Sequence, residues 1–355
     1  MALALAGLVV PGAWADDGNV ERRVHRPHIV TPLATGSPTG LSPAQVKAAY
    51  NFPTGLNGGA GRTVAVVAPF DAPTIEKDLN TFSRKFGLPG CTTANGCFRK
   101  VDQRGGTHYP AKNKLWALEI ALDVEWLHAI APGADILLVE ARSDRLSDVL
   151  VAEDYATAHA RYVTNSLGID EFAGESGDDS HFHRPGVSIF AASGDDGAAN
   201  GPGYPAASNQ VTAVGGTTLT LNADGTRASE TAWAGAGSGC SAIESKPSWQ
   251  KDTGCARRAV ADVSAVADPA TGLAVYDTTR YQGQKGWFAV GGTSASSPMW
   301  AARAAVSGRV IDARLLYAAS SPIAFRDVTA GNNGRPALPG FDLVTGLGSW
   351  TGPTP

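Results

Sequence analysis

Residues 63–69 read Thr-Val-Ala-Val-Val-Ala-Pro, a continuous apolar and β-branched run that follows Gly61 and ends in proline. Such a run is typical of a central strand of a parallel sheet, because helices cover both faces of that strand. The same signature recurs at 134–139, 187–192 and 211–214. Buried strands of this kind predict a parallel sheet at the centre of the fold.

Helical patterns separate these strands. They cover residues 74–86, 114–130 and 145–162, and a further helix at 41–50 opens with a serine cap and a proline suited to the first turn. Alternating strands and helices over this length predict an α/β fold with a doubly wound, mainly parallel sheet and helices on both faces. In such sheets ligands bind at the carboxyl ends of the strands. We therefore expect the functional residues there.

The overall composition excludes several classes of protein. With 355 residues, of which 43% are hydrophobic and 17% charged, the chain can bury a large core. A net charge of -4 provides no basic surface for nucleic acid, and no apolar run reaches the roughly 18 residues of a membrane span. We expect a monomer with neither a nucleic acid nor a membrane partner.

The N-terminal region is predicted to direct export. Residues 1–15 are interpreted as a signal peptide, with an apolar segment at 2–10 and a small-x-small site, Ala-Trp-Ala, at 13–15. No Lys or Arg precedes the apolar segment, so a frayed apolar terminus is the alternative. Residues 16–40 are predicted to form an N-terminal arm, and the main domain follows at 41–355. With this organisation, we expect a secreted, extracellular protein.

Four cysteines agree with export, because disulfides persist in oxidising compartments. Cys91 and Cys97 bracket one short loop, and Cys240 and Cys255 bracket another. Four cysteines allow three pairings, of which the two local ones are geometrically easiest. Neither pair has the Cys-x-x-Cys spacing of a metal site.

A glycine turn at residues 291–298, Gly-Gly-Thr-Ser-Ala-Ser-Ser-Pro, leads into an apolar run at 299–306. We predict that Ser297 caps a helix and that Pro298 is its first residue. Ser294 then lies just ahead of a helix N-terminus, where backbone N–H groups and the helix dipole favour a developing oxyanion. Ser294 is therefore a candidate nucleophile. The alternative is a serine-rich turn that only caps a buried helix.

Two carboxylates interrupt the apolar helix predicted at 114–130. Glu119 and Asp123 lie four residues apart on one face, and such a like-charge pair is destabilising, more so when it is removed from water. A pair kept at this cost indicates a function. The alternative is a solvated acidic strip that also includes Glu125.

Two acidic glycine turns are further candidates. Asp195 lies in Ser-Gly-Asp-Asp-Gly at 193–197, directly after the strand at 187–192, although a turn without chemistry is an equal alternative. Near the C-terminus, Asp327 and Asp342 belong to glycine-rich loops whose oxygens could bind calcium, which takes about six or more oxygen ligands. An Asx-rich surface loop is the alternative there.

The ordered set of motifs resembles one known family. Glu119 and Asp123 with the Ala-Pro-Gly-Ala that follows, then Ser-Gly-Asp at 193–195, then Gly-Thr-Ser-x-Ser-x-Pro at 292–298, are similar to the sedolisin family of serine-carboxyl peptidases. The likeness runs from Leu41 to Gly348. It implies a subtilisin-like fold and a serine-type endopeptidase that acts on polypeptides.

The resemblance also implies the role of each residue. Ser294 matches the nucleophile, Glu119 its general base, Asp123 the acid that partners Glu119, and Asp195 the donor to the oxyanion. A carboxylate can act as the base where histidine does elsewhere, if it is ionised when attack begins, whereas Asp195 must be protonated to donate. One ionised and one neutral acid imply work at acidic pH.

For the C-terminal loop, the resemblance implies one calcium ion. Asp327 and Asp342 match the carboxylate ligands of the family, and the backbone oxygens of Val328, Leu338 and Gly340 lie in the corresponding places. Leu338 stands where the family often has glycine, a change that a carbonyl ligand tolerates. The domain at 41–355 is thus expected to be a peptidase domain with a C-terminal calcium-binding loop.

Members of the family usually have a large propeptide ahead of the catalytic domain. Here only the arm at 16–40 separates the predicted signal peptide from the predicted peptidase domain. We therefore expect that a separate propeptide or inhibitor acts in trans.

Two rival functions come from other classes. A histidine-based, subtilisin-type hydrolase would use Asp71, a histidine and Ser294. Among the seven histidines, His128 lies nine residues after Glu119, which places it on the opposite side of the helix. The second rival is a secreted binding protein that keeps the fold and the calcium loop without catalysis.

Overall fold

The computed structural model describes residues 21–25, 36–251, 254–318 and 323–352. The predicted signal peptide at 1–15 lies outside these ranges, and so does most of the predicted arm at 16–40. Within the described ranges, no helix has both the length and the apolar character needed to cross a membrane.

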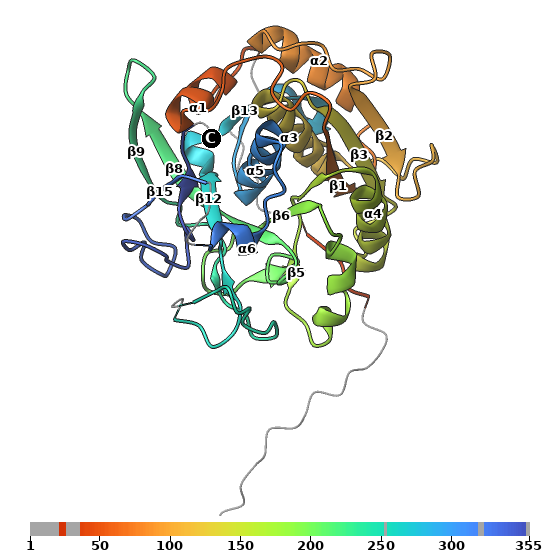
Figure 1. Ribbon diagram of the computed structural model, residues 1–355. Helices are drawn as coiled ribbons and strands as arrows, with labels where there is room; N and C mark the ends of the chain where they lie inside the picture. Colours follow the sequence, from red (N-terminus) through yellow and green to blue (C-terminus); the bar gives the residue numbers. More distant parts are fainter. Residues whose placement is uncertain (1–20, 26–35, 252–253, 319–322, 353–355) are drawn as a thin grey trace, which may run out of the picture.

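A mainly parallel sheet forms the centre of the fold (Figure 1). Its strands follow in the order β15 (Phe325–Arg326), β16 (Ser349–Trp350), β12 (Val263–Val266), β8 (Thr212–Leu221), β6 (Ser188–Ala192), β4 (Tyr162–Asn165), β1 (Thr63–Pro69), β3 (Asp135–Ala141) and β2 (Phe98–Asp102). All neighbours from β16 to β2 pair in parallel, whereas β15 pairs antiparallel with β16, and β9 (Arg227–Ala232) pairs antiparallel with β8.

Helices cover both faces of this sheet. On one face lie α3 (Lys114–Ile130) and α5 (Thr293–Ser307), which pack against each other and against the central strands, with α1 (Pro43–Tyr50) and α2 (Ile75–Phe86) outside α3. On the other face α4 (Leu146–His159) packs on β1 and β3. The short α6 (Ala313–Leu316) follows α5, and its Leu316 belongs to the apolar cluster that contains α3 and α5. The predicted doubly wound α/β architecture is confirmed.

The side chains of β1 show why the strand is apolar throughout. Val64 and Val66 belong to the apolar cluster that contains α3 and α5, whereas Ala65 and Val67 belong to the cluster that contains α4. Alternate residues of a strand point to opposite faces. A strand covered on both faces therefore needs apolar residues at every position.

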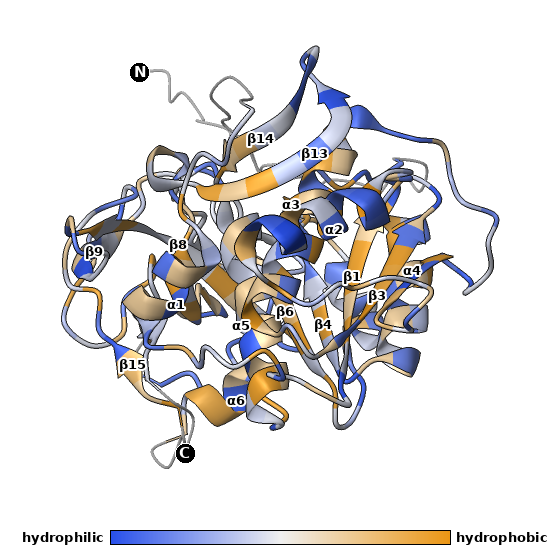
Figure 2. Cartoon of the chain, turned by 90° about the horizontal axis from the view of Figure 1, so that it is seen from above, coloured by the Kyte–Doolittle hydropathy of each residue, from blue (hydrophilic) through white to orange (hydrophobic). Residues whose placement is uncertain are grey.

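A second, small sheet lies over the helices. β13 (Leu273–Tyr281) and β14 (Gln284–Val290) form an antiparallel hairpin beside α2 and α3, as Figure 2 shows. The indole Nε1 of Trp126 in α3 donates to the carbonyl of Ala274 at 2.9 Å, which joins the hairpin to the core.

Short elements complete the described chain. Two more antiparallel pairs join β5 (Ile169–Asp170) to β7 (Gly203–Tyr204) and β10 (Gly239–Cys240) to β11 (Ala259–Val260), and short 3-10 turns occupy Glu175–Gly177, Asp179–Phe182 and Pro269–Thr271. Cysteines pair locally, as Cys91–Cys97 and Cys240–Cys255. The pairing that was easiest geometrically is the one observed.

One element boundary differs from its prediction in a way that matters for the site. The helix expected at 145–162 ends at His159, and Tyr162–Asn165 forms the fully buried strand β4 between β1 and β6. Four residues are too few to show a strand period, so the helical pattern before them was extended too far. Because β4 is a central strand, the residues after its carboxyl end face the site.

Candidate active site

The buried helix α3 brings Glu119 and Asp123 to the centre of the fold. Both side chains are 0% exposed, and so is Glu125, because the helix is packed on all sides. The solvated acidic strip is therefore wrong. Burial first, and then the neighbouring Glu119, raise the pKa of Asp123 well above its usual range, while a hydrogen bond from Ser166 lowers it. The net effect favours the protonated form of Asp123 beside Glu119.

The helix that carries Ser294 begins earlier than its sequence suggested. α5 starts at Thr293 and its N-cap is Gly292, so the predicted cap Ser297 and the predicted first residue Pro298 are both inside the helix. The reason is the turn itself. Gly292 has a φ of 123°, a conformation that favours glycine and lets the chain enter the helix at once. Ser294 therefore lies in the first helical turn.

A proline inside a helix removes one backbone hydrogen bond, and here a side-chain hydroxyl lies beside the carbonyl that is left without its donor. Pro298 has no N–H to donate to the carbonyl of Ser294, four residues earlier. Instead, the hydroxyl of Ser166, which follows β4, lies 3.4 Å from that carbonyl oxygen and 2.7 Å from Oδ1 of Asp123. Ser166 thereby links the acidic helix α3 to the serine turn of α5.

The hydroxyl of Ser294 is buried and makes no hydrogen bond with the described residues. It does not cap α5, because the cap is a glycine without a side-chain bond. A buried polar atom without a partner is costly, and such atoms concentrate at functional sites. This placement favours the nucleophile interpretation over the capping turn.

Asp195 lies at the N-terminus of the same helix. Its Oδ1 accepts from the backbone N–H of Thr293 at 2.7 Å and from the Thr293 hydroxyl at 2.9 Å. The turn is held from behind by Gly237, whose N–H donates to Gly194 at 2.7 Å and where a Cβ would collide with the carbonyl of Ser193. A cavity at this end of the sheet is lined by the whole Ser193–Gly197 turn.

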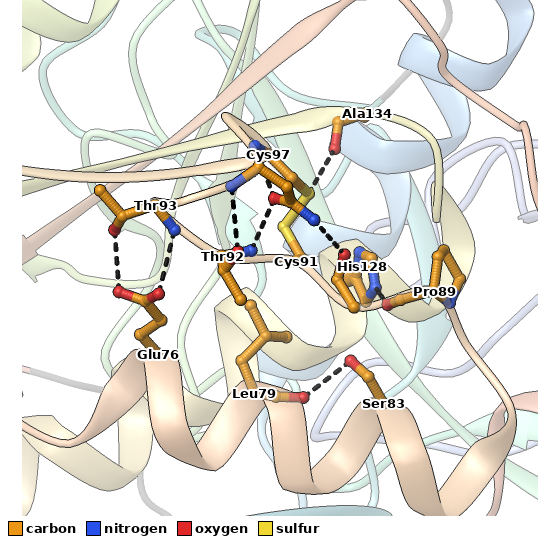
Figure 3. Close-up of a disulfide and its surroundings, with 12 residues drawn as sticks. Glu76, Leu79, Ser83, Pro89, Cys91, Thr92, Thr93, Cys97, His128 and Ala134 are labelled. Carbon is orange, nitrogen blue, oxygen red and sulfur yellow. Dashed lines mark hydrogen bonds between the residues drawn. A yellow bond between two sulfur atoms is a disulfide. The ribbon is translucent and has the colours of Figure 1, made fainter.

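The histidine of the rival mechanism belongs to a different part of the fold. Figure 3 shows His128 beside the Cys91–Cys97 disulfide, with its Nε2 at 2.9 Å from the carbonyl of Pro89. Asp71, the rival's acid, pairs with Lys100 at 2.5 Å. Since both groups are engaged away from Ser294, these contacts argue against a site that combines Asp71, His128 and Ser294.

The same region contains a cluster with the spacing of metal ligands. Sulfurs of Cys91 and Cys97 and a ring nitrogen of His128 lie within 4.8 Å of one another. Metal binding needs thiolates, and both sulfurs are consumed in the disulfide. The cluster is therefore a disulfide that packs against His128, and its sulfurs are not available as metal ligands.

Comparison with known proteins identifies the family. A family model described as "Subtilase family" matches residues 112–316, which include Glu119, Asp123, Asp195 and Ser294. The chain belongs to the subtilase family.

Relatives of this subtilase agree with the motifs. It is 30% identical to kumamolisin of Bacillus sp. (strain MN-32) over an alignment of 363 residues, which covers 89% of this chain and 63% of kumamolisin. It is 35% identical to sedolisin of Pseudomonas sp. (strain 101) over 179 residues, or 43% of this chain and 30% of sedolisin. The chain thus spans less than two thirds of the curated relatives it matches.

A solved structure supports the same assignment for the subtilase. Pseudomonas sedolisin, a serine-carboxyl proteinase complexed with two molecules of pseudo-iodotyrostatin, superposes with a TM-score of 0.76 at 26% identity, covering 89% of this chain and 96% of that one. The resemblance to the sedolisin family and the subtilisin-like fold are confirmed.

Two residues of the site were not singled out from the sequence of this subtilase. Ser166 joins Asp123 to the Ser294 turn, and Thr293 fixes Asp195. A usable signal existed for Ser166, since Ser-Leu-Gly at 166–168 follows a short run with two β-branched residues, but the predicted helix at 145–162 included the first residue of that run. Thr293 precedes the nucleophile candidate in a glycine turn, where a hydroxyl can bond neighbouring backbone.

The predicted calcium loop brings its five residues together. Oδ2 of Asp327 accepts from the N–H of Gly340 at 2.8 Å, and Oδ2 of Asp342 accepts from the N–H of Leu338 at 3.1 Å. Both carboxylates therefore meet at the turn 338–340. The carbonyls of Val328, Leu338 and Gly340 accept no hydrogen bond from the described residues. Oxygen donors of this kind fit calcium.

Proposed function

We propose that this subtilase is a secreted serine-type endopeptidase that hydrolyses peptide bonds at acidic pH with a carboxylate as its base. The similarity to sedolisin, a serine-carboxyl proteinase, supports the class of reaction. Two disulfides support an oxidising, extracellular location. Polypeptides are the substrates, and the working form is a monomer.

One observation carries the proposal. The buried Ser294 hydroxyl lies in the first turn of α5, and this turn is tied by Ser166 to Asp123 of the buried acid pair on α3. An acid pair at the centre of a fold destabilises it unless the pair has a use. Ser294 needs a base to become a nucleophile. The carboxylate pair, packed against its helix, can act as that base.

The chemistry follows from these positions. A bond forms between the Ser294 oxygen and the substrate carbonyl carbon as Glu119 takes the hydroxyl proton. The carbonyl oxygen becomes an oxyanion, which accepts hydrogen bonds from protonated Asp195 and from the backbone N–H of Ser294. The carbon–nitrogen bond then breaks, and Glu119 returns the proton to the leaving amine. Water repeats the sequence to release the acyl group.

The remaining acids prepare this step. Because Asp123 keeps its proton, it can donate to Glu119 and leave that carboxylate as the single base. Thr293 holds Oδ1 of Asp195 with two bonds, so the proton that Asp195 donates resides on Oδ2. Each carboxyl is thereby fixed by a hydroxyl from a neighbouring element.

Cleavage of a denatured polypeptide mixture should peak in acid and fade toward neutrality. The reason is that Asp195 loses the proton it donates, and a negative charge then faces the oxyanion. In Asp195→Asn an N–H donor persists at every pH. We expect this variant to lose about 10- to 100-fold at the acidic optimum and to show a flatter alkaline decline. Initial rates from acidic to neutral pH measure both effects.

Circular dichroism at each pH separates titration of the site from loss of the fold. A neutral or alkaline optimum in the parent protein would contradict the carboxylate mechanism. Complete absence of cleavage by a folded protein at every pH would favour the binding-protein rival instead.

Calcium at the loop of Asp327 and Asp342 should stabilise the fold. An ion that binds only the native state adds about 3 kcal/mol when its concentration is 100 times Kd. Chelation is therefore expected to lower the Tm by several degrees. Asp327→Asn removes an exposed ligand with little packing and serves as the control, since its Tm should no longer respond to the chelator. Identical melting of the parent protein with calcium and with chelator would remove the calcium assignment.

A further inference from the structure

Arg303, in the C-terminal half of α5, is a buried cation. Its side chain is 0% exposed, although arginine is almost never fully buried unless it is paired. The central carbon of its guanidinium lies 4.7 Å from the centre of the Trp350 ring and 5.3 Å from that of the Phe52 ring. Aromatic side chains from opposite ends of the chain thus enclose the charge.

The hydrogen-bonding capacity of this guanidinium is mostly unused. Arginine has five N–H donors. Here Nη2 donates to the carbonyl of Gly352 at 3.2 Å, whereas the buried Nε and Nη1 find no acceptor in the part of the chain that the structure describes. A buried donor without an acceptor destabilises a fold, and more so when the donor is charged. The guanidinium therefore has room for a further acceptor.

The charge of Arg303 is also uncompensated. Among the residues that the structure describes, no carboxylate pairs with it, and burial alone lowers its pKa to about 10. The acid beside the nearby Tyr50 hydroxyl is Glu230, which pairs with Arg227 at 2.6 Å and so is already neutralised. Because a pKa of about 10 keeps Arg303 protonated at neutral pH, the fold contains a positive charge without a counter-charge.

A small cavity adjoins this charge. Its volume is about 10 Å³, and its walls are formed by Arg303 together with Tyr50, Phe52, Ala265, Met299, Trp300 and Trp350. This volume is about what one water-sized sphere requires. A phosphate or a peptide carboxylate is too large for it, whereas the adaptable side chain of Met299 can accommodate the slightly larger radius of a halide.

We propose that this cavity binds one chloride ion, which accepts a hydrogen bond from an N–H group of Arg303 that lacks a protein acceptor and neutralises the buried guanidinium. The site is separate from the candidate active site. Arg303 follows Ser294 by nine residues on the same helix, which is roughly 13 Å along the helix axis.

The proposed ion would join three parts of the chain. Arg303 belongs to α5, Phe52 follows α1, and Trp350 belongs to β16. Just after β16, the N–H of Gly352 donates to the carbonyl of Tyr50 in α1 at 3.1 Å. A bound anion removes the penalty of a buried unpaired charge at this junction, so we expect it to stabilise the folded state.

Thermal unfolding of the full-length protein tests the proposal. Chloride replaces gluconate, an anion too large for the cavity, at constant sodium and calcium concentrations. The Tm should rise by about 2 °C for each tenfold increase of chloride above Kd, because only the folded state binds the ion. Arg303→Met keeps an unbranched apolar side chain and removes the charge, so its Tm should not respond to chloride.

A matched control removes an arginine that does not line the cavity. Arg309 is exposed and lies just after α5, so Arg309→Met should respond to chloride as the parent protein does. None of these variants alters the candidate active site, and the result is therefore independent of the proposed function.

Bromide gives a direct readout that needs no variant. Crystals of the parent protein grown in sodium bromide should show an anomalous-scattering peak in contact with the Arg303 guanidinium, inside the cavity. A Tm of the parent protein that does not depend on chloride, an undiminished chloride response in Arg303→Met, or a cavity without bromide would each overturn the proposal.

Discussion

Ser294→Ala is expected to lower kcat for peptide cleavage by about a million-fold, the loss typical of a serine nucleophile that works with its base as one unit. The stability of the fold should not decrease. The Ser294 hydroxyl makes no hydrogen bond with the described residues, so removing it relieves a buried polar group and leaves the Tm unchanged or slightly higher. Rates on a denatured polypeptide and thermal unfolding of the same preparation measure both expectations.

A second variant shows whether the base is Glu119. Glu119→Gln keeps the shape of the side chain and removes its carboxylate. The rate of cleavage should therefore fall nearly as far as in Ser294→Ala, and at every pH. Residues that act together are not additive, so the double variant should be no slower than Ser294→Ala alone. Full activity in Glu119→Gln, or turnover above background in Ser294→Ala, would place the chemistry elsewhere.

The long, fully buried elements were the ones that sequence could predict. Residues 63–69 form β1 and residues 114–130 form α3, both with the predicted bounds. An unbroken β-branched run is typical of a buried strand, and a long helix that is apolar on nearly every side must be buried in the core. Glu119 and Asp123 were recognisable for the same reason. Two carboxylates stand out in a helix that is otherwise apolar.

Features set by distant contacts could not be predicted in this way. Pro298 is a good first helical residue locally, but α5 begins at Thr293, after the turn at Gly292, and Ser166, 128 positions before Ser294, lies beside the carbonyl that the proline leaves without a donor. The docking of the arm against Asp144 and Gly168 is equally non-local. Local propensity is a weak guide where tertiary contacts compensate for its violation.

Outside the site, a second acidic cluster lies under the β13–β14 hairpin. Asp78 of α2, Glu125 of α3 and Asp277 of β13 are at most 1% exposed. Asp78 accepts from the Thr74 and Thr278 hydroxyls, Glu125 accepts from the N–H of Tyr276 at 2.9 Å, and Asp277 accepts from the N–H of Thr279 at 2.6 Å. Lys77 is the cation that lowers the pKa of Asp78. These carboxyls join the hairpin to two helices.

Their titration should make the protein less stable as the pH rises. Burial raises the pKa of Asp277 to about 7, with Asp78 adding in the same direction, and burial also raises the pKa of Asp78 and, well above its usual range, that of Glu125. The folded state therefore holds protons that the unfolded chain releases near pH 4. Between pH 4 and 7, the free energy of unfolding should fall by about 4 kcal/mol from Asp277 alone.

Asp277→Asn should remove that part of the pH dependence while keeping the Oδ1 acceptor for Thr279. At pH 4 the variant and the parent protein should unfold at similar urea concentrations, because Asp277 is protonated there. At pH 7 the variant should be the more stable by about 4 kcal/mol, since the parent protein must keep a desolvated charge or bind a proton. Equal slopes of stability against pH in the two proteins would show that Asp277 does not titrate in this range. The fade of activity toward neutrality would then not come from loss of stability through Asp277.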